Sequence, residues 1–192
     1  MNAILSTSEK CSAIEKHINE NIPLAAQGAC PASHYVLEKK SAYALIAALT
    51  SGRPLLVQGE PGIGKSELAR AAAYLLDSPL LSSVVQPDST YQELLWDMDY
   101  TKRLADAQLA AIEGSSAKVT DTKNYIAPGV LWYAINWASA EQQAKRCSSN
   151  FQPASDISAD NVKTAGCVLL IDEVDKSDIS FANGLLCNPP VN

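Results

Sequence analysis

The sequence predicts an α/β protein with a parallel sheet, because short, largely apolar runs alternate with helix-forming segments. Leu55–Gln58, Leu80–Val85 and Cys167–Ile171 have the length and composition of buried strands. An Ala- and Leu-rich segment, Ser66–Leu76, separates the first two runs and favours a helix. Because a strand, helix, strand sequence closes through a right-handed crossover, these two strands are expected to be parallel.

Three further segments favour helices. Tyr35–Thr50 is rich in helix formers and is followed by Gly52, which can provide a left-handed stop. Lys102–Glu113 places apolar residues at a spacing that would bury one face. Val130–Gln143 follows Pro128-Gly129 and is expected to lie as one helix against the sheet.

The predicted domain organisation is one domain with a short N-terminal extension. Residues 1–32 carry turn signals at Ile22-Pro23 and Gly28-Ala29-Cys30-Pro31, and we interpret them as a loosely ordered lead-in. Residues 33–192 then form the domain. A composition of 47% hydrophobic and 19% charged residues is typical of an ordinary globular protein.

Charge and composition argue against several classes of protein. With 21 acidic and 15 basic residues the net charge is -6, so the basic footprint of a nucleic-acid-binding protein is missing and no such partner is expected. No apolar run reaches the roughly 18 residues that a membrane helix needs, and the N-terminus lacks the basic region of a secretion signal. The five cysteines include no C-x-x-C pair, which argues against a zinc site or a disulfide framework. We therefore expect a cytoplasmic protein with reduced thiols and no membrane partner.

A phosphate-binding motif lies between the first predicted strand and its helix. Residues 59–66, Gly-Glu-Pro-Gly-Ile-Gly-Lys-Ser, match G-x-x-x-x-G-K-[ST] at every fixed position. The glycines let the backbone bring its amides against anionic oxygens, and the N-terminus of the following helix also favours an anion. Lys65 would reach the β- and γ-phosphates, and the Ser66 hydroxyl would ligate Mg²⁺. The expected nucleotide-binding positions are Gly59, Glu60, Pro61, Gly62, Ile63, Gly64, Lys65, Ser66 and Glu67.

An acidic pair completes the expected site. The apolar run that ends at Ile171 leads directly into Asp172 and Glu173. Asp172, at the strand end, is the candidate for the Mg²⁺ shell together with Ser66, whereas Glu173 would orient and polarise the attacking water. Lys65 and Glu173 are accordingly the candidate catalytic residues. An apolar run followed by Asp-Glu usually marks only a strand end, but its combination with the phosphate motif favours a functional role.

At these two motifs the sequence resembles the MoxR-like branch of the AAA+ ATPases, within the dynein-related AAA group. The similar stretches are residues 52–69, GRPLLVQGEPGIGKSELA, and residues 168–177, VLLIDEVDKS. Residues 181–186 are similar to the helix that follows in those proteins. In the family's terms, residues 59–66 are the Walker A motif and residues 168–173 the Walker B motif.

The resemblance implies a P-loop NTPase fold, with a three-layer αβα core and a parallel sheet ordered 5-1-4-3-2. Residues 33–192 would supply only the N-terminal part of the module. Strands four and five should follow the helix near Phe181 and are not in the sequence, so the domain looks truncated after the Walker B strand and that helix. The resemblance also implies ATP and Mg²⁺ as ligands, ATP hydrolysis coupled to remodelling of partner proteins, and assembly into a homo-oligomeric ring.

Two alternative functions stay open. The first is a truncated nucleotide-binding fragment without turnover, because the family's sensor, arginine-finger and lid residues lie beyond these 192 residues, and we expect the chain alone to be nearly inactive. The second is another P-loop NTPase, a kinase or a nucleic-acid motor, in which Asp172-Glu173-Val174-Asp175 would be a DExD box. The acidic composition weakens the motor reading.

Overall fold

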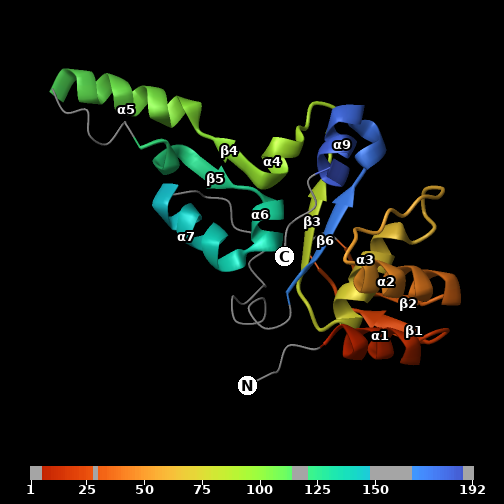
Figure 1. Ribbon diagram of the computed structural model, residues 1–192. Helices are drawn as coiled ribbons and strands as arrows, with labels where there is room; N and C mark the ends of the chain where they lie inside the picture. The colour runs from red at the N-terminus through yellow and green to blue at the C-terminus, as the bar shows by residue number, and fades with distance from the viewer. Residues whose placement is uncertain (1–5, 28–29, 114–120, 148–165, 188–192) are drawn as a thin grey trace. The chain divides into compact units, whose positions relative to one another are not determined.

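The computed structural model describes residues 6–27, 30–113, 121–147 and 166–187 (Figure 1). The chain divides into two compact units, unit 1 with residues 1–82 and 160–172, and unit 2 with residues 83–159 and 173–192. Among the described residues, no helix combines the length and the apolar character that crossing a bilayer requires.

The elements of unit 1 are α1 (Thr7–Lys16), β1 (Asn21–Leu24), β2 (Ser33–Val36), α2 (Lys39–Ser51), α3 (Lys65–Leu75), the start of β3 (Leu80–Val84) and β6 (Val168–Asp172). Those of unit 2 are α4 (Tyr91–Leu95), β4 (Trp96–Met98), α5 (Tyr100–Glu113), η1 (Thr122–Tyr125), β5 (Ile126–Pro128), α6 (Val130–Ile135), α7 (Trp137–Cys147), η2 (Val174–Lys176) and α9 (Ile179–Cys187).

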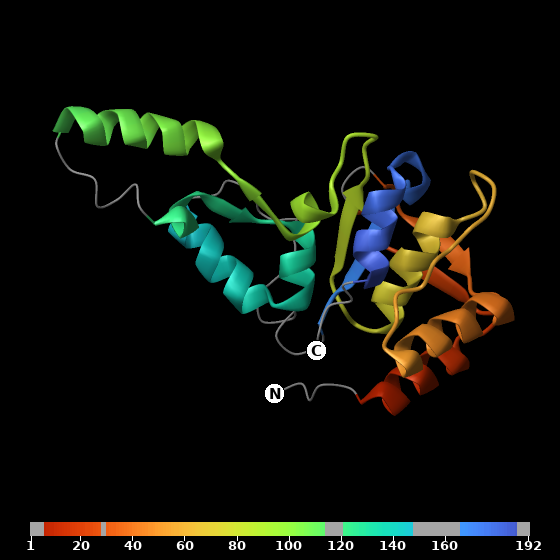
Figure 2. The same cartoon turned by 45° about the horizontal axis from the view of Figure 1, so that its top comes forward.

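Strands β3 and β6 confirm the predicted parallel sheet of an α/β fold. They are hydrogen-bonded neighbours and point the same way in Figures 1 and 2. At the start of the pair, the Val168 amide donates to the Pro79 carbonyl at 2.8 Å. Helix α3 and strand β6 are in contact, so a helix covers the sheet as the sequence predicts.

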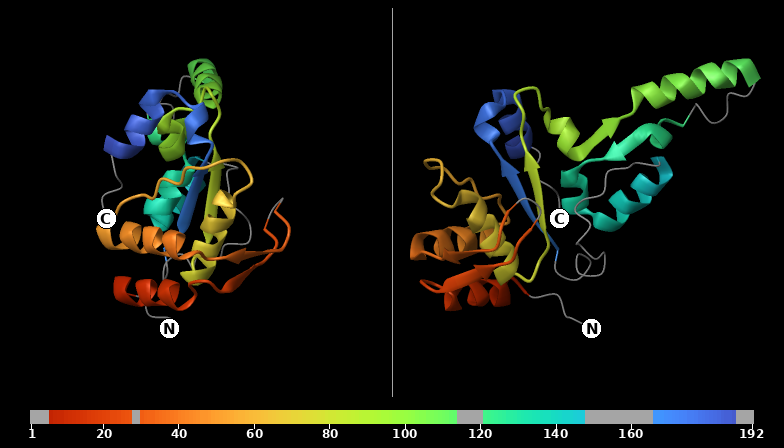
Figure 3. Two further views of the ribbon diagram at one scale, coloured as in Figure 1. Left: turned by 90° about the vertical axis from the view of Figure 1, so that its right-hand side faces the viewer. Right: turned by 180° about the vertical axis from the view of Figure 1, so that it is seen from behind.

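The described N-terminal residues, 6–27 and 30–36, include a helix and two strands, whereas the sequence predicts a loosely ordered lead-in over residues 1–32. A capping box between Ser6 and Glu9 starts α1, and β1 pairs with β2 in an antiparallel hairpin. Ile14, Ile22 and Leu24 are buried in one core with side chains of α3, which include Leu68 and Leu75. Figures 2 and 3 show α1 beside α2 in this unit. The turn signals at Pro23 and Pro31 misled the prediction because strands of four residues carry too short a pattern to recognise.

The prediction of a strand at Leu55–Gln58 is wrong. This segment is irregular, and its side chains face water, with Leu56 81% and Val57 38% exposed. A strand needs a hydrogen-bonded neighbour, and none of the described strands pairs with it. The crossover from this segment to β3 is therefore absent in the described residues.

Two predicted helices have different boundaries. Tyr35 belongs to β2, and the helix predicted from Tyr35 begins instead at Lys39 and ends at Gly52, whose φ of 63° provides the left-handed stop. The helix predicted over 130–143 is broken at Asn136 into α6 and α7. The break has a local cause, because the Asn136 side chain accepts a hydrogen bond from the Ser139 amide at 3.0 Å and so caps α7.

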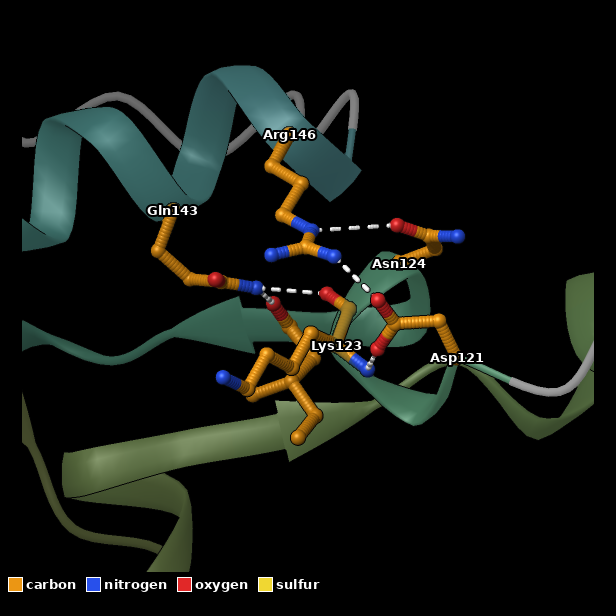
Figure 4. Close-up of polar contacts among 6 residues, drawn as sticks. Asp121, Lys123, Asn124, Gln143 and Arg146 are labelled. Carbon is orange, nitrogen blue, oxygen red and sulfur yellow. Dashed lines mark hydrogen bonds and ion pairs between the residues drawn. The ribbon is translucent and has the colours of Figure 1, made fainter. Parts of the chain in front are cut away.

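Helix α7 is fastened to η1 and β5 by side chains near its C-terminal end (Figure 4). The Gln143 amide donates to the carbonyls of Lys123 and Ile126, both at 2.7 Å. Arg146 donates to the Asn124 side chain at 3.1 Å and forms an ion pair with Asp121. These contacts connect α7 to the strand that pairs with β4.

Helix α5 forms as predicted, but its apolar residues are not buried. Leu104 is 62% exposed and Ile112 is 83% exposed. The helix instead contacts its own unit through polar groups: the Tyr125 hydroxyl donates to Asp106 at 3.0 Å, and the Lys102 ammonium donates to the Cys147 carbonyl at 3.0 Å. Periodicity correctly indicates the helix, whereas these distant polar partners decide which side faces the unit.

A pair of leucine variants tests the core of unit 1 and the exposure of the segment before the phosphate motif. Leu37 is fully buried in the core, so Leu37→Ala should lower the free energy of unfolding by about 2 to 5 kcal/mol. Leu56→Ala should change it by less than about 0.5 kcal/mol, since Leu56 faces water. Urea unfolding followed by circular dichroism measures both values. A loss of about 2 kcal/mol or more for Leu56→Ala would indicate a buried strand there after all.

Candidate functional site

The phosphate motif forms a loop that ends where α3 begins. Gly62 and Gly64 have φ angles of 82° and 86°, in the left-handed region that side-chain-bearing residues rarely adopt. Gly64 is the N-cap of α3, so the loop runs directly into the first turn of the helix. The free amides of such a turn and the positive end of the helix dipole favour an anion at this position.

Lys65 extends over the loop that precedes it. Its ammonium donates to the carbonyl oxygens of Gly59 and Glu60, both at 2.8 Å. These bonds join the first residue of α3 to the beginning of the loop and hold a positive charge beside the glycine backbone. An ammonium so placed provides a point charge for phosphate oxygens.

Ser66 and Asp172 meet across unit 1. The Ser66 hydroxyl lies 3.1 Å from Oδ2 of Asp172 and donates to it, although 106 positions separate the two residues in the sequence. Ser66 stands in the first turn of α3, and Asp172 is the last residue of β6. Hydroxyl and carboxylate oxygens are hard ligands of the kind that Mg²⁺ prefers, so the pair fits the predicted metal ion.

Glu173, in unit 2, begins a tight turn directly after β6. Its φ of 59° and ψ of 33° are left-handed, an uncommon conformation for a residue with a long side chain. The carboxylate forms an ion pair with the Lys176 ammonium, with Oε2 and Nζ 2.7 Å apart. Glu173 is half-buried, so its side chain is accessible to water although its carboxylate is paired with Lys176.

The remaining predicted positions lie on the loop and in the first turn of α3. Glu60, Pro61 and Ile63 are exposed on the loop. Glu67 lies in the first turn of α3, and one of its carboxylate oxygens is 4.0 Å from the Arg70 guanidinium. The structure thus brings together the loop, Lys65, Ser66 and Asp172 in unit 1, and Glu67 faces along the helix toward Arg70.

Two residues near the loop are absent from the sequence prediction. The Tyr35 ring lies against Gly64, and the buried side chain of Arg70 reaches the segment between β1 and β2. The sequence gives a weak indication of the role of Arg70. A charged residue within the apolar run Leu68-Ala69-Arg70-Ala71-Ala72 suggests a buried side chain with a specific polar partner. Tyr35 offers no local signal.

Cys167 precedes β6 and has a raised pKa. Burial disfavours the charged thiolate and raises the pKa of this thiol to about 11. The thiol is therefore protonated and a poor nucleophile at neutral pH.

A helix-flanked parallel strand pair, together with a glycine-rich loop that leads into a helix and a carboxylate at a strand end, defines a P-loop NTPase. The model of the AAA domain, dynein-related subfamily, matches residues 54–187. The chain belongs to this family, which confirms the predicted AAA+ fold and makes it a nucleotide-binding domain of the ATPase class. Searches of curated proteins and of solved structures returned no match.

The pairing of Ser66 and Asp172 predicts a metal-dependent effect for one carboxylate. Asp172→Asn should weaken the binding of ATP in the presence of Mg²⁺ by about ten- to a hundredfold, because the charge near the metal is lost. Without Mg²⁺ the variant and the wild type should bind ATP about equally well. Isothermal titration calorimetry with and without Mg²⁺ measures the difference.

Asp175→Asn is the matched control, since Asp175 is exposed in the turn that follows Glu173. It should bind Mg²⁺-ATP like the wild type. Equal losses for the two variants would remove Asp172 from the metal site.

Proposed function

We propose that this chain is the ATP-binding part of a MoxR-like AAA+ ATPase, an enzyme that hydrolyses ATP with Mg²⁺. The observation that carries the proposal is the hydrogen bond between Ser66 and Asp172 at the first turn of α3. It joins the end of the phosphate loop to the end of β6, where P-loop ATPases hold the metal ion.

The roles of the residues follow from their chemistry. Backbone amides at Gly62, Gly64 and the start of α3 would donate hydrogen bonds to the phosphate oxygens. The Lys65 ammonium would give up its hydrogen bonds to the loop carbonyls and bind the β- and γ-phosphates instead. Ser66 and Asp172 would hold Mg²⁺, which supplies charge neutralisation for the phosphate groups when bound.

Glu173 would orient the attacking water and receive its proton. Phosphoryl transfer depends mainly on positioning and on charge stabilisation, so a carboxylate that directly follows Asp172 in the chain is well placed for this role. The left-handed turn at Glu173 is consistent with a functional constraint, since strained backbone tends to occur at functional sites.

Assignment to the MoxR-like branch rests on residues 52–69 and 168–177. The coupling of hydrolysis to remodelling of partner proteins, and assembly into a homo-oligomeric ring, follow from that assignment and are part of the proposal.

Nucleotide binding without turnover is the second candidate function. Its support is the irregular, exposed segment Leu55–Gln58 that leads into the phosphate loop. A loop whose entering strand is not formed is anchored on one side only, at α3. Such a loop can receive phosphates while the reacting groups stay poorly fixed, and misplacement by about 1 Å costs on the order of a hundredfold in rate.

Lys65 should be essential for binding under either candidate. Lys65→Ala removes the positive charge from the loop and should abolish binding of a fluorescent ATP analogue, measured by anisotropy. Lys40→Ala, on the exposed side of α2, is a charge-matched control and should bind like the wild type. Equal affinities of Lys65→Ala and the wild type would refute the assigned site.

Turnover by the wild type separates the two candidates, and Glu173→Gln tests the role of Glu173 in the first. The variant keeps the shape of the side chain but cannot accept the proton, so it should bind Mg²⁺-ATP with wild-type affinity and hydrolyse it at least about a hundredfold more slowly. Release of labelled phosphate under single-turnover conditions measures the rate. If the wild type binds ATP but does not hydrolyse it, the second candidate is favoured. If the wild type hydrolyses ATP and Glu173→Gln does so at the same rate, Glu173 is not the water-orienting residue.

A further inference from the structure

The ring of Tyr35 lies against Gly64, the last glycine of the phosphate loop. A Cβ added to Gly64 would lie 3.3 Å from Cε2 and 3.8 Å from Cδ2 of Tyr35. Gly64 therefore has two reasons to be glycine, its φ of 86° and the close approach of the ring. The contact joins β2 to the residue from which α3 starts.

Arg70 fixes the same hairpin at a second point on α3. Its side chain is only 7% exposed, and its guanidinium donates to the carbonyls of Ala25 at 2.6 Å and Pro31 at 3.1 Å. A third bond runs to the Ser33 hydroxyl at 3.3 Å. A buried guanidinium is costly unless its donors are used, and here it fastens the segment between β1 and β2 to the helix.

The two points lie on one face of β2. Side chains two residues apart along a strand point to the same side, and Ser33 and Tyr35 are half-buried whereas His34 and Val36 are exposed. Gly64 and Arg70 are six residues apart, about 9 Å along a helix. The hairpin is thus held at two separate points along α3, which fixes the placement of the Tyr35 ring.

The hairpin is itself rigidly supported. Tyr35 pairs with Ile22 in the β1–β2 register, and Ile22 and Leu37 are buried in the core of unit 1. The Tyr35 side chain itself packs against this core.

We propose that Tyr35 is a positioning residue for the phosphate loop, whose ring holds Gly64 in its left-handed conformation and so pre-orders the loop for the triphosphate of ATP. The proposal rests on the proposed function, because it takes the loop as the phosphate site. Glycine-rich loops lose much conformational freedom on binding, and a loop ordered in advance binds more tightly. The ring acts on the part of the ligand that the loop receives, so the triphosphate and not the base is affected.

The test compares Mg²⁺-ATP with Mg²⁺-tripolyphosphate, which has the phosphates but no base. Tyr35→Ala should weaken the binding of both ligands by a similar factor, about three- to tenfold, in isothermal titration calorimetry. Tyr35→Phe should restore wild-type affinity for both, because the ring and not the hydroxyl touches Gly64. Tyr74→Ala, an exposed tyrosine on α3, is the matched control and should leave both affinities unchanged.

Each of the following results would overturn the proposal. Loss of ATP binding with unchanged tripolyphosphate binding would mean that Tyr35 contacts the base, and unchanged affinity for both ligands would mean that it does not affect the loop. If the wild type bound neither ligand, the proposed function would fail, and this inference would fail with it. If Lys65→Ala lost binding of both ligands while Tyr35→Ala bound both like the wild type, the inference alone would be overturned. If circular dichroism shows that Tyr35→Ala is unfolded, Tyr35→Leu, which keeps apolar bulk over the core, is judged by the same criteria.

Discussion

The hydrogen bond between Ser66 and Asp172 is the contact on which the site of unit 1 depends, because it joins the first turn of α3 to the end of β6. Two features make it possible. Gly64, the N-cap of α3, has a φ of 86°, and this left-handed conformation directs the chain from the loop into the first turn of the helix. The small buried side chain of Ala71 lets α3 approach its neighbours closely, and Val168 of β6 packs against the same core. Residues distant in sequence are thereby brought together as the pair of oxygen atoms that we propose as Mg²⁺ ligands.

Helix α3 is also supported by the N-terminal elements. Arg70 contributes the polar part of this support, through hydrogen bonds to Ala25, Pro31 and Ser33. Leu68 and Leu75 contribute the apolar part, in a core shared with Ile14 and Ile22 of the N-terminal elements. Since the phosphate loop ends at the first residue of α3, support of this helix also limits the motion of the loop. The N-terminal residues therefore belong to the architecture of the site.

The parts of the site that the sequence predicts are those whose chemistry demands particular residues at fixed spacing. The run from Gly59 to Ser66 and the strand that ends at Asp172 could be recognised because glycine angles, a lysine charge and hard oxygen ligands have few substitutes. The predicted strand at Leu55–Gln58 could not be tested by such chemical requirements, since a strand is stabilised by neighbours that its own residues do not encode. The contacts of Tyr35 with Gly64, and of Arg70 with the hairpin, are equally non-local. For α5, periodicity predicts the helix, but the partners of Lys102 and Asp106 lie elsewhere in the chain.

The central claim is that unit 1 carries one site for ATP that depends on Mg²⁺. The most direct measurement is a calorimetric titration of the unmodified chain with ATP in the presence of Mg²⁺, repeated in excess EDTA and with Mg²⁺-GTP as a second ligand. The account predicts one ATP per chain, with an affinity that falls when Mg²⁺ is withdrawn, because Ser66 and Asp172 then lose the ion that they share. Absence of binding, or an affinity for ATP that is the same with and without Mg²⁺, would contradict it.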